Sequence, residues 1–148
     1  MLLILAASAL VGCGEDRNDA LGPDAPTGEA PPAGTAVNGV EREWVVLSDL
    51  DQVPAGPVTF TFTNAGTTVH EMLVVKTDLP LFGLPVDPMT QRFSEESTEW
   101  EVISEIPEYE VGETKDLTLT LEPGRYQLVC NLPAHYANGM ATALQVYS

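Results

Sequence analysis

The chain has 148 residues, which is enough for one domain with a sizeable core and additional segments. Its 22 acidic and 6 basic residues give a formal net charge of −16. This charge argues against nucleic-acid binding, because phosphate recognition needs clustered Lys and Arg. The acidity fits either a solubilising surface or a face that attracts a basic partner protein, and composition leaves both interpretations open.

Residues 1–13 form an apolar run that ends in small residues, the pattern of a secretory signal. The run is shorter than the roughly 20 residues that a membrane-spanning helix needs. Its end, Leu10-Val11-Gly12-Cys13, resembles the bacterial lipobox, in which the Cys becomes the lipidated first residue of the mature protein. The segment before Cys13 has no basic side chain, unlike the usual signal, so an uncleaved apolar N-terminus with an incidental Cys stays an alternative.

Residues 14–39 are rich in Gly, Pro, Ala and acidic residues and show no hydrophobic period, which predicts a flexible linker. A flexible segment of about 25 residues has an r.m.s. reach of roughly 25–30 Å. Such a linker would let a tethered domain sample nearby partners. Residues 40–148 are expected to form the folded domain.

Strand signals recur through residues 40–148. The segment 58–63 alternates Val and Phe with Thr, which predicts a half-buried strand. Further strands are expected at residues 44–47, 69–76, 117–121, 126–130 and 142–147. Several short strands joined by Pro and Gly turns, without a long helix, predict an all-β sandwich.

Three segments of this domain are less regular. Residues 49–56 are expected to form a turn, because they contain Pro54 and Gly56. Residues 77–98 are interrupted by several prolines and are expected to form an irregular excursion with one helical turn at most. Residues 99–106 fit either a strand or a short helix.

The segment from Cys130 to Met140 places a thiol, an imidazole and a thioether in one loop. Four residues separate Cys130 from His135, and four separate His135 from Met140. These donors suit an ion that cycles between Cu(I) and Cu(II), because sulfur favours the reduced ion and imidazole accepts either state. The chain contains one other His, His70, which makes it the remaining candidate ligand. A buried Cys alone is commonly inert. The interpretation as a copper site therefore depends on finding the Cys together with two His and a Met.

These segments resemble the cupredoxins, the type 1 or blue copper proteins. One matching segment is the turn at 64–66 followed by His70. The other is the strand 126–130, which runs into His135 and Met140. The ligand spacing is most similar to that of rusticyanin, sulfocyanin and the phytocyanins, and the resemblance covers residues 40–148.

The resemblance implies a Greek-key β-sandwich and a mononuclear copper site. Carried over position by position, His70, Cys130 and His135 would be the strong trigonal ligands, and Met140 would be the weak axial ligand. The implied function is electron transfer by one copper ion in a monomeric protein. If the lipobox is functional, Cys13 would hold this protein at the bacterial cell envelope. Redox proteins would be its partners, and its acidity favours basic ones.

Two residues depart from the family pattern. Many cupredoxins have Asn directly after the first His, and its side chain ties the two ligand loops together, whereas this chain has Glu71. Either Glu71 takes over that hydrogen bond or the site is held less tightly. Pro133 has no N–H, so an amide hydrogen bond to the Cys130 sulfur must come from another residue. Glu71 and Asn131 are the expected supporting residues around the ligands.

His135 is expected to lie near the surface and to give the electron its exit. Its apolar neighbours Leu132, Pro133 and Ala134 would then form a docking patch. The same ligands would also serve an envelope protein that stores, delivers or senses copper, and this alternative stays open. A structural β-domain without metal is a third interpretation.

Enzymatic classes are disfavoured by what the chain lacks. A binuclear copper-A centre needs two Cys in the loop, and multicopper oxidases and copper nitrite reductases need more than two His. A zinc enzyme would keep an open position and usually a carboxylate or a third His. A Ser/His/Asp set would consume a proposed ligand. An enzyme is therefore not expected.

Overall fold

The structure of the chain is a computed structural model that describes residues 34–148. Within these residues the fold consists of nine β-strands and one short 3-10 turn, without an α-helix. In chain order the elements are β1 (Thr35–Arg42), β2 (Val45–Ser48), β3 (Gln52–Pro54), β4 (Gly56–Asn64), β5 (His70–Thr77), β6 (Trp100–Tyr109), β7 (Thr114–Leu121), β8 (Gly124–Val129), η1 (Tyr136–Asn138) and β9 (Ala141–Tyr147).

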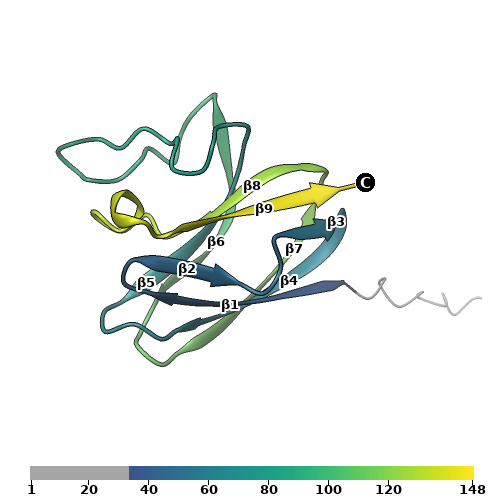
Figure 1. Cartoon of the computed structure of the whole chain (residues 1–148), viewed down its shortest axis with the longest axis horizontal. Coiled ribbons are helices and arrows are strands. Elements are labelled where there is room, and N and C mark those ends of the chain that lie inside the picture. The colour runs from purple at the N-terminus through teal and green to yellow at the C-terminus, as the bar shows by residue number, and fades with distance from the viewer. Residues whose placement is uncertain (1–33) are drawn as a thin grey trace, which may run out of the picture.

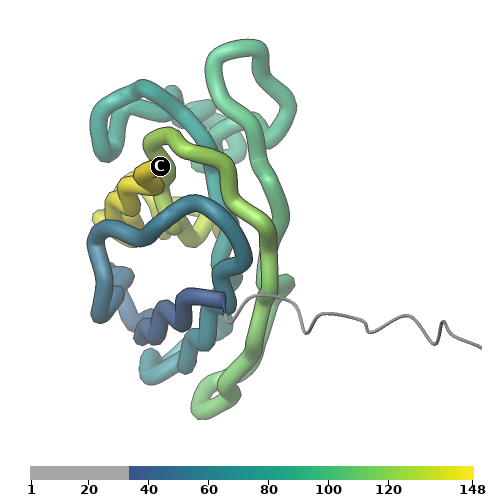
Figure 2. The backbone as a smooth tube through the Cα atoms, turned by 90° about the vertical axis from the view of Figure 1, so that its right-hand side faces the viewer, coloured from purple at the N-terminus to yellow at the C-terminus, as the bar shows by residue number. Residues whose placement is uncertain are grey.

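The strands form two sheets, ordered β2-β1-β4-β7 and β3-β9-β8-β5-β6 (Figure 1). β1 runs parallel to β4 and β3 runs parallel to β9, whereas the other paired neighbours are antiparallel. The backbone of the two sheets surrounds an interior (Figure 2). Buried side chains from both sheets form one cluster there. This arrangement confirms the predicted all-β, Greek-key sandwich.

The core is built by the alternation of the strands. Val58, Phe60 and Phe62 of β4 are fully buried, and they meet Tyr126 and Leu128 from the opposite sheet in one cluster. Burying an apolar side chain of this size contributes about 1.5–3 kcal/mol, so these alternating positions decide which face of each strand turns inward.

β5 is different, because nearly all of its residues are buried. It lies between β8 and β6, and its outer face is covered by the excursion of residues 77–98. Leu73 and Val75 pack there against Leu84, Phe93 and Tyr136. The excursion contains one isolated bridge and no named element, and it lies beside the loop that leads into β9 (Figure 1).

Two sequence-based expectations are corrected by the structure, and one choice that the sequence left open is decided. β1 begins at Thr35, so residues 35–39 belong to the first sheet and not to the linker expected at 14–39. Val37 is buried and lies opposite Phe60 of β4. The next two residues, Asn38 and Gly39, have a low preference for strands, so the sequence does not indicate this strand. Residues 49–56 include the short strand β3, which pairs with β9. Residues 99–106 fitted either a strand or a short helix, and residues 100–106 lie in the strand β6.

The predicted signal at residues 1–13, the lipidation site Cys13 and the linker as far as residue 33 lie outside the described residues. Within residues 34–148, no helix has the length and apolar character needed to cross a membrane.

Candidate metal centre

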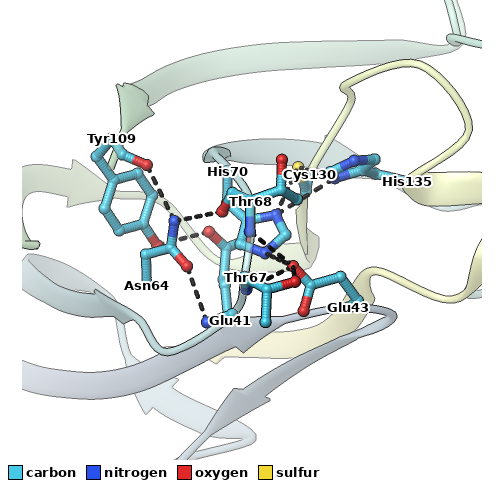
Figure 3. Close-up of polar contacts among 10 residues, drawn as sticks. Glu41, Glu43, Asn64, Thr67, Thr68, His70, Tyr109, Cys130 and His135 are labelled. Carbon is cyan, nitrogen blue, oxygen red and sulfur yellow. Dashed lines mark hydrogen bonds and ion pairs between the residues drawn. The ribbon is translucent and has the colours of Figure 1, made fainter. Parts of the chain in front are cut away.

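His70 is placed by a loop that Asn64 organises from its buried side chain. Asn64 Oδ1 accepts a hydrogen bond from the Gly66 N–H at 2.9 Å. Its Nδ2 donates to the carbonyls of Thr68 at 2.9 Å and Tyr109 at 3.0 Å (Figure 3). The Asn-Ala-Gly signal is therefore an Asx-type turn. The loop that follows this turn ends where His70 begins β5, and the His70 ring is fully buried.

The other candidate ligands come from the loop between β8 and β9. The Cys130 N–H donates to the Met140 carbonyl at 3.0 Å, and the Met140 N–H donates to the His135 carbonyl at 3.1 Å. Gly139 has a positive φ of 119°, and a Cβ there would lie 2.8 Å from the Trp44 carbonyl oxygen. Backbone hydrogen bonds and one close approach thus close the loop onto the β1–β2 turn.

The three predicted strong ligands converge. Nδ1 of His70 lies 3.3 Å from Nδ1 of His135. Cys130 Sγ lies 3.3 Å from Nδ1 of His135 and 4.0 Å from Nδ1 of His70. Donors that share one ion at near-tetrahedral to trigonal angles lie roughly 3.3–3.7 Å apart. Two of the three distances lie in this range and the third, 4.0 Å from Cys130 Sγ to His70 Nδ1, is slightly longer, so a small movement would let the three atoms share one metal ion.

The protonation of the three side chains suits a metal as well. Burial lowers the pKa of His70, with the nearby His135 adding to the effect, and burial also lowers the pKa of His135. Both rings are therefore neutral at neutral pH, the form that binds metals. Burial raises the pKa of Cys130 to about 12, so the sulfur keeps its proton until a cation displaces it. Donor atoms facing one another in a buried site are chemically suited to a cation.

Met140 is fully buried and belongs to the same core cluster as Cys130. The backbone hydrogen bonds of the loop place it one residue before β9. Its thioether is a soft donor of the kind that type 1 copper sites use in the axial position. The axial role of Met140 stays a prediction.

The amide hydrogen bonds to the Cys130 sulfur do not involve Pro133. Burial has the larger effect on the pKa of the Cys130 thiol and raises it, while the backbone N–H groups of Glu71 and Leu132 lower that pKa by hydrogen bonding to the sulfur. The Glu71 side chain does not take over the inter-loop hydrogen bond through Oε1, which is buried without a hydrogen-bond partner among the described residues. Burial raises the pKa of Glu71 to about 7. Glu71 thus supports the site through its backbone.

Asn131 anchors the ligand loop to the excursion. Its Oδ1 accepts from the Phe93 N–H at 3.0 Å, and its Nδ2 donates to the Phe93 carbonyl at 3.1 Å and to Glu95 at 3.0 Å. This side chain is buried and directly follows Cys130. Asn131 therefore fixes the start of the loop against residues 77–98, and not against the loop that carries His70.

Two residues at the site were missed by the sequence analysis. Trp44 meets the His135 ring edge to face, with centroids 5.5 Å apart, and Glu43 Oε1 lies 3.6 Å from His70 Nε2. Both belong to the β1–β2 turn, which lies beside the candidate ligands when β1 pairs in parallel with β4. The expected docking patch needs a correction, because Leu132 is buried and only Pro133 and Ala134 are accessible.

Comparison with known proteins agrees with this geometry. No curated protein matches the chain. The fold is similar to that of dithionite-reduced auracyanin from Roseiflexus castenholzii, at 23% identity and a TM-score of 0.56, covering 78% of this chain and 99% of that one. It is also similar to auracyanin A, a "blue" copper protein from Chloroflexus aurantiacus, at 24% identity and a TM-score of 0.54, covering 77% and 99%. Reduced rusticyanin is similar at 23% identity and a TM-score of 0.51, and the match covers 78% of this chain and 81% of that one.

The family match is more specific than the likeness in fold. Residues 51–147 match the model of the copper-binding proteins of the plastocyanin/azurin family. This region is more than half of the chain, and it contains His70, Cys130, His135 and Met140. The chain therefore belongs to the plastocyanin/azurin family of copper-binding proteins, and its cofactor is copper.

Proposed function

We propose that this protein transfers electrons through one copper ion at a type 1 site. His70, Cys130 and His135 would be its strong ligands, with Met140 as the weak axial ligand. The observation that carries the proposal is the convergence of two imidazole Nδ1 atoms and one thiol sulfur, all within 4.8 Å of one another. When bound, copper supplies the one-electron couple between Cu(I) and Cu(II).

The protein contributes a fixed geometry. Asn64 holds the loop before His70, Asn131 holds the loop after Cys130, and backbone hydrogen bonds join Cys130 to Met140. These contacts restrain the donor atoms from several directions, so the side chains need to rearrange little when the charge of the site changes. His70, Cys130 and Met140 are fully buried, which excludes water from the site.

His135 is the exit for the electron in this proposal. It is 9% exposed, whereas the other three candidate ligands are fully buried. A partner that docks beside Trp44 and Pro133 would therefore come closest to the site through the His135 ring. The accessible Pro133 and the half-exposed Trp44 offer apolar contact at this point.

We also propose the setting of this activity. Lipidation of Cys13 would hold the domain outside the cytoplasm at the bacterial cell envelope, and the net charge of −16 favours basic redox partners. Growth of expressing bacteria with labelled palmitate tests the anchor: the label should enter the wild-type chain and be absent from Cys13→Ser. An unlabelled wild-type chain would contradict the anchor without touching the copper site.

Enzymatic copper chemistry is not part of the proposal. The chain has two His, and both lie in this site. None remains for the additional copper centres of copper oxidases or nitrite reductases. The presence of only two His in the chain, both in one candidate site, supports the function of an electron carrier.

A visible spectrum of the copper-loaded protein tests the proposed function. The full chain loaded with Cu(II) should show an intense thiolate-to-copper band that bleaches with ascorbate and returns on reoxidation. A chain without this band that instead binds Cu(I) tightly would be a copper carrier or storage protein. Failure to bind either ion would contradict both functions.

A further inference from the structure

We propose that Glu43 is a positioning residue for the copper ligand His70. Its carboxylate would hold the imidazole proton on Nε2, so that Nδ1 is free to face the metal. The inference rests on the proposed function, and it concerns a residue of the β1–β2 turn that lies outside the ligand-bearing segments.

The contact itself is the first observation. His70 Nε2 lies 3.6 Å from Glu43 Oε1 (Figure 3). Nε2 is buried and has no hydrogen-bond partner within the described residues, whereas Nδ1 of the same ring faces His135 and Cys130. The separation is longer than a direct N–H···O hydrogen bond. A small movement of either side chain would close it, and it would satisfy the orphaned ring nitrogen.

Glu43 is held in place by the loop that carries His70. Its Oε1 accepts the N–H groups of Thr67 at 2.8 Å and Thr68 at 3.0 Å, and the Thr67 hydroxyl lies at 3.3 Å. These donors keep the pKa of Glu43 at about 2, so the carboxylate carries its charge at neutral pH. The turn and the ligand loop are therefore cross-linked at the carboxylate that faces Nε2.

Gly66 gives the second, independent observation. A Cβ at this position would stand 2.6 Å from His70 Nε2 and 2.8 Å from Glu43 Oε1. Real Cβ atoms do not approach other heavy atoms this closely. Only glycine leaves room beside both the ring nitrogen and the carboxylate, which explains why the turn that starts at Asn64 carries glycine here.

The chemistry of such a pair is directional. A carboxylate that accepts from one imidazole nitrogen fixes the tautomer and makes the other nitrogen a stronger donor. A negative charge near the metal also favours the more highly charged Cu(II) over Cu(I). Glu43 should therefore orient His70 and lower the reduction potential of the site.

The first test uses the metal-free wild-type full chain. The chain has two His, so their imidazole 15N and 1H resonances can be assigned with one substitution, His135→Gln. The expected result is a His70 ring that carries its proton on Nε2. A proton on Nδ1 of His70, donated to the facing Nδ1 of His135 at 3.3 Å, would overturn the proposal.

The second test compares Glu43→Gln with Glu101→Gln in the copper-loaded protein. Glutamine keeps an acceptor for Thr67 and Thr68 and removes only the charge. Glu101 is exposed and lies opposite Lys76 in the register of β6 with β5. Lys76 is six residues along β5 from His70, so Glu101 lies roughly 20 Å from His70. Both variants lose one negative charge, so their difference reports the position of Glu43.

We expect Glu43→Gln to reduce the preference for Cu(II) over Cu(I) roughly tenfold relative to Glu101→Gln. This ratio corresponds to a reduction potential that is higher by about 59 mV for a one-electron couple. Equal potentials in the two variants would overturn the proposal. A purely structural clamp on Thr67 and Thr68 would leave the potential at the control value, because glutamine keeps the acceptor for both residues.

Failure of the proposed function remains distinguishable from failure of this inference. A wild-type chain without the intense visible band would contradict type 1 electron transfer, while the tautomer of His70 in the metal-free protein would still decide the role of Glu43. If Glu43→Gln does not fold, the same measurement on the wild-type chain decides it.

Discussion

The indole of Trp44 meets the imidazole of His135 edge to face, with centroids 5.5 Å apart and an angle of 89° between the ring planes. Trp44 is 48% exposed, so its indole forms the surface beside the least buried candidate ligand. Its neighbour Glu43 faces His70. Two consecutive residues of the β1–β2 turn therefore contact both imidazoles of the site.

Replacement of Trp44 by Leu should destabilise the metal-free protein. Edge-to-face aromatic pairs contribute about 0.5–1.5 kcal/mol beyond the area that they bury. Urea unfolding of Trp44→Leu should show a loss of this size relative to Tyr147→Leu. Tyr147 is also 48% exposed and has no aromatic partner in the described part of the chain. An equal loss of unfolding free energy in the two variants would show that the contact between the two rings adds no stability.

The candidate ligands could be picked out from the sequence, because few side chains in this chain can bind a soft metal. A chain with two His and one Cys in its folded part offers few ways to build a soft-metal site. The strand at residues 58–63 could also be predicted, because apolar residues that alternate with Thr indicate one buried face and one exposed face. Both kinds of signal are local in the chain.

The features that the sequence hid depend on contacts between distant segments. β1 is a strand because Val37 and its neighbours pair with β4, and the local preferences of Asn38 and Gly39 point the other way. Glu43 and Trp44 become part of the site only after that pairing carries the β1–β2 turn to the ligands. Asn131 was expected beside the metal site, but its partner Phe93 lies in a segment without a periodic pattern.

Replacement of Cys130 by Ser should abolish the visible band of the copper-loaded protein. The band requires a thiolate bound to copper, and a Ser hydroxyl is a hard donor that keeps its proton at neutral pH. Absorption spectra of copper-loaded wild type, Cys130→Ser and the distant control Glu101→Gln would measure the effect. A retained intense band in Cys130→Ser would contradict the whole copper assignment.

Replacement of Met140 by Leu should keep the band and shift the reduction potential upward. Leu has nearly the volume of Met, so the fully buried position should lose less than about 1.5 kcal/mol of stability. The three candidate strong ligands remain, while loss of the thioether would remove an axial donor that tunes the potential. Voltammetry of the variant and wild type tests this expectation. An unchanged potential would show that Met140 fills the core without an axial role.

Glu41 should make the stability of the metal-free protein depend on pH. Its side chain is fully buried on β1, Tyr109 donates a hydrogen bond to its Oε2 at 2.6 Å, and Oε1 has no partner among the described residues. Burial raises the pKa of Glu41 to about 8 from 4.5, and the charge of Glu71 adds to the rise. The folded state thus favours the protonated acid.

The sign of the effect follows from that difference. The contribution of Glu41 is fully present below pH 4.5 and is lost as the pH rises through about 8, because the unfolded chain gives up its proton first. The loss between these limits is about 4 kcal/mol. Glu41→Gln cannot ionise and keeps a polar partner for Tyr109. Its unfolding free energy relative to wild type should therefore rise from pH 5 to pH 8 by roughly this amount.

Urea unfolding of both proteins at half-unit pH intervals measures this difference. The comparison cancels the titration of His70, His135 and Cys130, which both proteins share. Glu71→Gln is the matched control: burial raises the pKa of Glu71 to about 7 from 4.5, so the gain in this variant should level off at a lower pH. A difference between wild type and Glu41→Gln that stays constant from pH 5 to pH 8 would show that Glu41 is ionised in the folded protein, with its charge balanced inside the core.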